Sequence, residues 1–159
     1  MEAGKEFGLK PYGIRAMNSL RVEKSYKLVG TELSIEYSPY ESGLDRFIHP
    51  NKGDFIGLAA LNRWREKGFS NKLVTMEVHG VTDADVLGNN PIYSNDSVVG
   101  RATGGDFGFR LNKSLALGMV KPDLAKVGQD LEIDILGKIH KVSIIEDSPY
   151  DPENKLLRA

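Results

Sequence analysis

The sequence of 159 residues predicts an α+β fold, in which a short helical segment precedes a small antiparallel β-barrel or sandwich. Two observations lead to this prediction. Apolar residues recur at helical spacing in the first 70 residues, whereas from residue 72 onward they alternate with a period of two. In addition, 17 glycines and seven prolines punctuate the chain, which is typical of many turns between short strands.

The first helix is expected over residues 11–27. Pro11 suits a first helical turn, and Gly30 is the expected stop. The apolar positions recur at helical spacing, at Ile14, Met17 and Leu20. This face must pack on something that its own short segment does not supply. The following stretch 34–53, rich in glycine and proline, is expected to be an irregular connector.

The second helix is expected over residues 54–67. Asp54 could cap its first turn, and Gly68 would end it. One face carries the apolar positions Ile56, Ala60 and Trp64.

Five or six short strands are expected after residue 72. KLVTMEVHG alternates between two faces and predicts a half-buried strand, and SLALGMV predicts another. NNPIYSNDSVVGRAT predicts a hairpin that turns at Asn95-Asp96. LEIDILGKIHKVSIIE predicts a strand pair that turns at Gly137-Lys138. A short helical or turn connection, VKPDLAKVGQDL, joins the two groups.

The composition argues against several classes of protein. A net charge of −1 gives no broad basic field, so neither nucleic acid nor a membrane is an expected partner. The absence of cysteine excludes disulfides and thiolate chemistry. The N-terminus does not resemble a signal peptide, and no apolar run approaches the ~20 residues that cross a bilayer. A cytoplasmic protein is therefore expected.

The motifs of common catalytic sites are missing. Gly104, Gly105 and Gly108 match neither dinucleotide nor phosphate-binding loops, and are expected to form a tight turn or bulge joining two strands. The three histidines have no spacing typical of a metal site, and His79 and His140 are expected to be exposed or half-exposed. No catalytic residue and no metal ligand is therefore assigned.

Arg21 is the strongest candidate for binding. In a helix over 11–27 it shares the face of Ile14 and Met17, so its guanidinium leans inward. A buried arginine needs an anion. That anion is either a carboxylate of the same chain, such as Glu41 or Asp45, or a ligand.

The order of motifs in the chain resembles a known family. YGIRAMNSLRVEKSYKLVGTELSIEYSPYESGLDRFI is similar to the second half of the folate-binding fold of the aminomethyltransferase (glycine cleavage T-protein) family, especially the version fused to dimethylglycine and sarcosine dehydrogenases. DFIGLAAL resembles the family's DFIGKEAL, and residues 88–120 resemble its C-terminal barrel. The motifs that carry the resemblance are Arg21-Val22-Glu23, Gly30-Thr31-Glu32, Pro39, Glu41-Ser42-Gly43-Leu44 and Lys113-Ser114-Leu115-Ala116.

This resemblance implies a division of the chain into two parts. Residues 1–53 would be the helical C-terminal remnant of a folate-binding domain plus connector, and residues 54–159 the family's C-terminal β-barrel domain. Most of the pterin pocket would lie upstream. The chain is therefore expected to be the C-terminal portion of a larger enzyme and to be inactive alone.

The resemblance also implies a ligand and the residues that bind it. Arg21 would contact tetrahydrofolate, with Glu23 as a second contact and the tail residues Tyr150 and Arg158 beside the same cleft. The complete enzyme would be a flavin-dependent dehydrogenase that demethylates an amine such as dimethylglycine or sarcosine. Its FAD would lie in a missing N-terminal domain.

Two alternatives stay open. The chain could be part of a stand-alone aminomethyltransferase of a glycine-cleavage system, with a lipoyl-carrier protein as partner. It could also be a non-catalytic barrel module that binds a partner protein.

Overall fold

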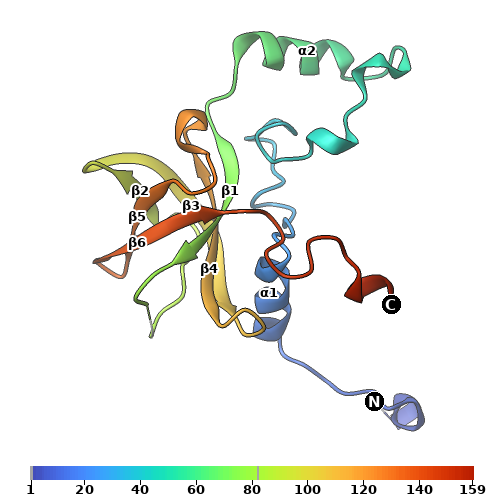
Figure 1. The fold of residues 1–159 in the computed structure, drawn as a ribbon. Helices are drawn as coiled ribbons and strands as arrows, with labels where there is room; N and C mark the ends of the chain where they lie inside the picture. Colours follow the sequence, from blue (N-terminus) through green and yellow to red (C-terminus); the bar gives the residue numbers. More distant parts are fainter. Residues whose placement is uncertain (1, 82) are drawn as a thin grey trace.

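A computed structural model describes residues 2–81 and 83–159. It confirms the α+β fold with an antiparallel β-barrel (Figure 1). The helices are α1 (Ile14–Glu23) and α2 (Leu58–Lys67). The strands are β1 (Lys72–Val78), β2 (Pro91–Ser94), β3 (Ser97–Gly108), β4 (Lys113–Val120), β5 (Asp130–Ile135) and β6 (Lys138–Ile145). Short 3₁₀ turns lie at Glu2–Phe7, Asp45–Phe47, Pro50–Lys52, Pro122–Leu124 and Leu156–Arg158.

The barrel is closed in the order β1-β4-β3-β2-β5-β6, with β6 returning to β1. The alternating apolar residues explain its core, because Val74, Met76 and Val78 point inward from one face of β1. Leu73 belongs to a second cluster on the other face, with Leu117 of β4. Strand β1 is therefore buried on both faces, rather than on one as its alternation suggested.

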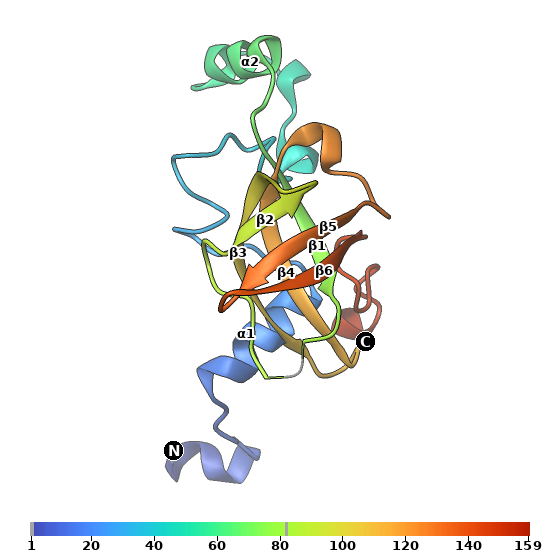
Figure 2. The ribbon, with the colours of Figure 1, turned by 90° about the vertical axis from the view of Figure 1, so that its left-hand side faces the viewer.

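Helix α1 packs against β3 and β4 on the outside of the barrel (Figures 1 and 2). It is shorter at both ends than the predicted 11–27. It begins after Gly13, and it ends because Ser25 adopts a left-handed φ of 52°. The Tyr26 N–H donates to the Arg21 carbonyl at 3.1 Å and closes the last turn. Gly30 lies beyond this end.

Helix α2 also begins later than predicted. Gly57, with a φ of 98°, precedes its first residue, so Asp54 does not cap it. Gly68 ends it as predicted. The expected apolar face does not pack, since Ile56 and Trp64 are exposed. In both views α2 stands away from the barrel (Figures 1 and 2).

The glycine-rich stretch lies inside the single long strand β3 rather than at a junction of two strands. The pairing of β3 with β4 shifts register between Ala102 and Gly104, so the expected bulge is present. Gly105 faces β4 so closely that an added Cβ would lie 2.5 Å from the Leu115 carbonyl oxygen. This close approach, rather than a turn, requires glycine there.

The turns and histidines differ slightly from expectation. The hairpin between β2 and β3 turns at Asn95 and Asp96 as predicted, both with positive φ. The β5–β6 turn lies at Leu136-Gly137, one residue early. His140 is buried within β6, so the expectation of an exposed or half-exposed side chain was wrong; its Nδ1 lies 3.4 Å from the His79 carbonyl oxygen.

The irregular connector is held to the barrel by Glu41. Its carboxylate accepts hydrogen bonds from Ser38, and from the N–H groups of Ser70 at 3.2 Å and Asn71 at 3.0 Å. Burial raises the pKa of the Glu41 carboxyl, but these hydrogen bonds lower it by more. The Leu73 N–H donates to the Glu41 carbonyl at 2.8 Å, which fixes the entry into β1.

Candidate functional site

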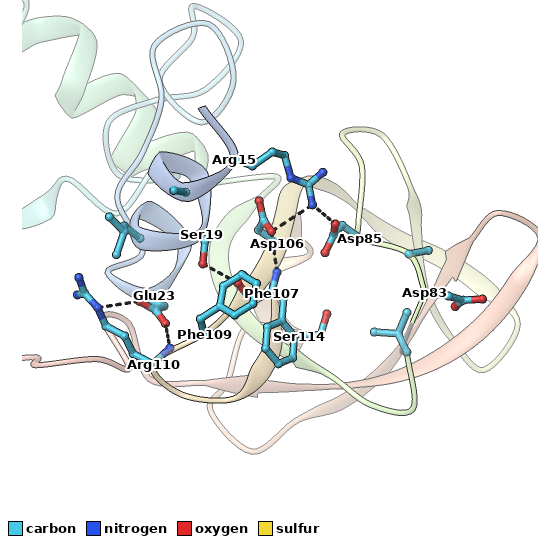
Figure 3. A pocket seen from close by; sticks show the side chains of 14 residues that line it. Arg15, Ser19, Glu23, Asp83, Asp85, Asp106, Phe107, Phe109, Arg110 and Ser114 are labelled. Atoms are coloured by element: carbon cyan, nitrogen blue, oxygen red, sulfur yellow. Dashed lines mark hydrogen bonds and ion pairs between the residues drawn. The ribbon is translucent and has the colours of Figure 1, made fainter. Parts of the chain in front are cut away.

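Two open cavities adjoin the C-terminal half of α1. The first, of about 900 Å³, lies between α1, the loop after β1 and the turn between β3 and β4 (Figure 3). The second, of about 670 Å³, lies between α1, the segment that follows it and the C-terminal tail. Leu20 and Arg110 line both cavities. A ligand that reached across these two residues would contact both sides of the helix.

Glu23 is the buried acid of the first cavity. The residue has an exposed fraction of 0%, although it lines the cavity wall. One oxygen, Oε1, accepts a hydrogen bond from the Arg110 N–H at 2.7 Å. The other, Oε2, has no hydrogen-bond partner among residues 2–81 and 83–159. A buried acceptor without a partner is costly, so Glu23 is predisposed to accept a donor from a ligand.

The opposite end of the first cavity joins α1 to the barrel. Arg15 pairs with Asp85 and lies 3.4 Å from Asp106, and both acids raise the pKa of its guanidinium. Asn18 donates to Asp106 at 2.9 Å and to the Gly105 carbonyl at 3.1 Å. These contacts fix the distance between the helix and β3.

Arg21 leans inward as predicted, and its partner belongs to the same chain. It is 9% exposed, donates to Asn18 Oδ1 at 3.1 Å, and lies 3.7 Å from Glu32. The expected partners were wrong. Glu41 is already bound by the connector, and Asp45 lies 3.4 Å from Lys72. Arg21 also lines the second cavity.

Glu32, the ion-pair partner of Arg21, is a second fully buried acid. Burial raises the pKa of its carboxyl, but four neighbours lower it by more: the Thr103 hydroxyl, the Leu28 N–H, the Thr31 hydroxyl and the Arg21 guanidinium. The net pKa lies below the usual 4.5. Folding is therefore favoured while Glu32 is ionised, and this contribution is lost as the pH falls through the lowered pKa.

A Glu32→Gln variant is expected to be about 1–3 kcal/mol less stable than wild type at pH 7, because hydrogen bonds to a charged acceptor are lost. Below pH 4.5 the two stabilities converge, since wild type loses this contribution there. Urea unfolding between pH 7 and about pH 3 measures both curves. A variant that stays parallel to wild type over this range would contradict the assignment. The exposed Glu153→Gln substitution is the control.

The C-terminal tail docks on the end of α1. The Tyr150 N–H donates to the Glu23 carbonyl at 3.0 Å. Lys24 Nζ donates to the carbonyls of Tyr150 and Asp151, and to Asn154 Oδ1 at 2.7 Å. The ammonium group of Lys24 therefore holds the tail against the end of α1.

The four predicted site residues do not share one cavity. Glu23 lines the first cavity, Arg21 and Tyr150 line the second, and Arg158 is exposed and lines neither. Sequence reasoning missed Arg110, which joins the two cavities. No motif marks it, because its contact with Glu23 spans 87 residues of sequence.

Other site types find no support in the part of the chain that the structure describes. Among those residues, no three His, Asp or Glu side chains lie close enough together to hold a metal ion. A helix with the length and apolar character for crossing a membrane is likewise not found there.

A closed barrel carries a docked helix, and a buried acid and a buried arginine of that helix line two neighbouring cavities, which defines the class as an α+β barrel domain. The chain belongs to the glycine cleavage T-protein family. Residues 71–151 match the family's "Glycine cleavage T-protein C-terminal barrel domain", and residues 1–52 match its "GCVT N-terminal domain".

The curated relatives include proteins of two kinds. Human mitochondrial dimethylglycine dehydrogenase is 39% identical over 92% of this chain and 17% of its own length. The aminomethyltransferase of Desulfitobacterium hafniense DCB-2 is 36% identical over 94% of this chain and 40% of its own length. The chain thus spans well under half of these relatives.

A solved structure shows the same fold. The glycine cleavage system aminomethyltransferase T from Bartonella henselae superposes with a TM-score of 0.78. The alignment covers 86% of this chain and 38% of the other, at 22% sequence identity.

Proposed function

We propose that this chain is the C-terminal part of a tetrahydrofolate-dependent one-carbon transfer enzyme. The observation that carries the proposal is the buried Glu23 carboxylate, which lines a cavity and has one oxygen without a hydrogen bond in the described part of the chain. The pterin ring of tetrahydrofolate presents an amino group and a ring N–H side by side. This planar pair of donors suits a buried carboxylate, which binds such groups by charge-assisted hydrogen bonds.

The surroundings of Glu23 suit the rest of the ligand. Phe107 and Phe109, whose rings meet edge to face at 5.0 Å, line the first cavity and offer apolar contact to a flat ring. Across Leu20, the second cavity holds the cations Arg21 and Lys27, which suit the carboxylates of a folate glutamate. Tyr150 is proposed to flank that end. Arg158 lines neither cavity, so its proposed contact needs a movement of the tail.

The proposed division of the chain follows from this arrangement. Residues 1–53 supply Glu23 and Arg21, and residues 54–159 supply the barrel against which they pack. The matches to two successive family domains, over 1–52 and 71–151, support this division. Neither part is proposed to supply a catalytic acid or base.

The enzyme is proposed to be a flavin-dependent dehydrogenase that acts on dimethylglycine or sarcosine. The 39% identity to human dimethylglycine dehydrogenase supports this choice. FAD would supply the oxidation of the amine in a domain outside these residues, and tetrahydrofolate would accept the one-carbon unit. A glycine-cleavage aminomethyltransferase, with a lipoyl-carrier protein as partner, is the second candidate because relatives of that name are 36% identical.

The test uses the full-length product of the gene that encodes these residues. Incubated with dimethylglycine, an electron acceptor and tetrahydrofolate, it is expected to form 5,10-methylenetetrahydrofolate. Formation of that product only from an aminomethylated lipoyl-carrier protein would establish the second candidate. If neither substrate yields it and 5-formyltetrahydrofolate does not bind in calorimetry, the folate proposal is wrong.

A further inference from the structure

Arg110 lies in the turn between β3 and β4, beside Glu23 Oε2, the oxygen without a hydrogen bond among the described residues. Its Nε is 3.8 Å from Glu23 Oε2, and its guanidinium carbon is 4.6 Å from the centre of the Tyr150 ring. Figure 3 shows the two side chains next to each other. The Arg110 side chain is 45% exposed, whereas Glu23 is buried. A partly exposed cation therefore lies next to a carboxylate that solvent does not reach.

The backbone and the side chain of Arg110 are held by different contacts. Its backbone N–H is fixed by Glu23 Oε1 at 2.7 Å. Its guanidinium, at 3.8 Å from Oε2, is beyond hydrogen-bond distance, and it rests on Tyr150 by a cation–π contact. The side chain can thus rotate away while the turn stays in place. Because Arg110 lines both cavities, the guanidinium can move towards the second one without leaving the protein surface.

We propose that Arg110 is a gate that covers the Glu23 carboxylate and restricts which ligands reach it. A ligand must displace the guanidinium, so it needs a planar edge with adjacent N–H donors, which replaces the interaction that the guanidinium gives up. Ligands that carry only acceptors leave Glu23 Oε2 without a hydrogen bond and are rejected. The identity of the ligand rests on the proposed function, whereas the gate itself rests only on the contacts of this chain.

The gate is tested on the chain without any ligand by labelling carboxylates with a carbodiimide and glycine ethyl ester, read by peptide mass spectrometry. In wild type, Glu23 and the equally buried Glu32 are expected to react slowly. In Arg110→Ala, Glu23 is expected to react about tenfold faster, equivalent to about 1.4 kcal/mol less free energy for exposing this carboxylate. Glu32 is expected to stay slow, which shows that the fold is intact.

Two further variants make the result decisive. Arg101→Ala removes an arginine of β3 that pairs with Glu36, and is expected to leave Glu23 labelling unchanged. Arg110→Gln keeps part of the side chain but loses the charge. If Arg110→Ala also speeds the labelling of Glu32, the labelling rates of Glu23 and Glu32 are compared in Arg110→Gln instead. Faster labelling of Glu23 alone supports the gate. Labelling of Glu23 at the wild-type rate in a folded variant overturns it.

Repeating the labelling in the presence of a folate tests the gate and the proposed function separately. In Arg110→Ala, 5-formyltetrahydrofolate is expected to slow the labelling of Glu23 again. If the substitution speeds labelling and this folate gives no protection in the full-length protein either, the gate is supported and the folate assignment is wrong. Protection of Glu23 with no effect of the substitution would support the folate assignment and overturn the gate.

Discussion

Replacing Glu23 by glutamine in the full-length protein is expected to weaken the binding of 5-formyltetrahydrofolate by about 10- to 100-fold. A hydrogen bond to a charged acceptor contributes about 1.5–3 kcal/mol, and each 1.4 kcal/mol is a factor of ten in affinity. The amide has nearly the same shape as the carboxylate, so the cavity is retained. What is lost is the charge that makes Oε2 a strong acceptor for two adjacent N–H groups. Calorimetric titration measures the affinity directly.

The matched control for this substitution is Glu32→Gln. Glu32 is equally buried, but it lines neither cavity, and its carboxylate is already surrounded by donors of its own chain. At pH 7 this variant is expected to lose stability while keeping the folate affinity of wild type. Equal affinities of wild type and Glu23→Gln, with similar melting temperatures, would remove Glu23 from the folate site.

Much of the barrel could be predicted because its signals are local. The alternation around Met76 marks an inward face, and the pair Asn95-Asp96 marks a hairpin turn, since both residues accept positive φ. The ends of α1 and α2 were predicted less well. The φ angles of Ser25 and Gly57 end or delay these helices. Serine rarely adopts a positive φ, and glycine permits one without requiring it, so neither helix end could be placed from the residue type alone.

The candidate site was harder to predict because its partners come from distant segments. Helical spacing placed Arg21 inward, but Glu32 became its partner through the irregular path of residues 25–44, where no periodicity exists to follow. The resemblance made Glu23 only a second contact after Arg21. Two residues beyond Arg21, Glu23 projects from a different side of α1. That direction is the one that points at the turn holding Arg110. The sequence therefore predicts that the first helix carries binding residues, whereas the contact between Glu23 and Arg110 follows only from the fold.

Replacing Gly105 by alanine is expected to lower the free energy of unfolding by about 3 kcal/mol, near the upper end for overpacking. The new Cβ would lie 2.5 Å from the Leu115 carbonyl oxygen and 2.9 Å from Val86 Cβ. The carbonyl belongs to β4, which is paired on both sides within the closed barrel, so it cannot withdraw without disturbing the ladder. For a domain of this size the melting temperature should fall by about 6–12 °C. Urea unfolding and calorimetry measure the two quantities.

Gly13→Ala is the control for this substitution. Gly13 precedes α1 with an ordinary φ of −84°, and nothing lies within 4 Å of an added Cβ, so its replacement should cost less than about 1 kcal/mol. The comparison separates two uses of glycine. Gly105 has no positive φ, so alanine could adopt its backbone conformation, and what forbids the methyl group is the close approach of β4 and of Val86. Wild-type stability of Gly105→Ala would therefore mean that the neighbouring bulge can absorb the methyl group. The Asn18 contact with the Gly105 carbonyl, which positions α1 and thus Glu23, would then rest on an adaptable strand rather than a fixed one.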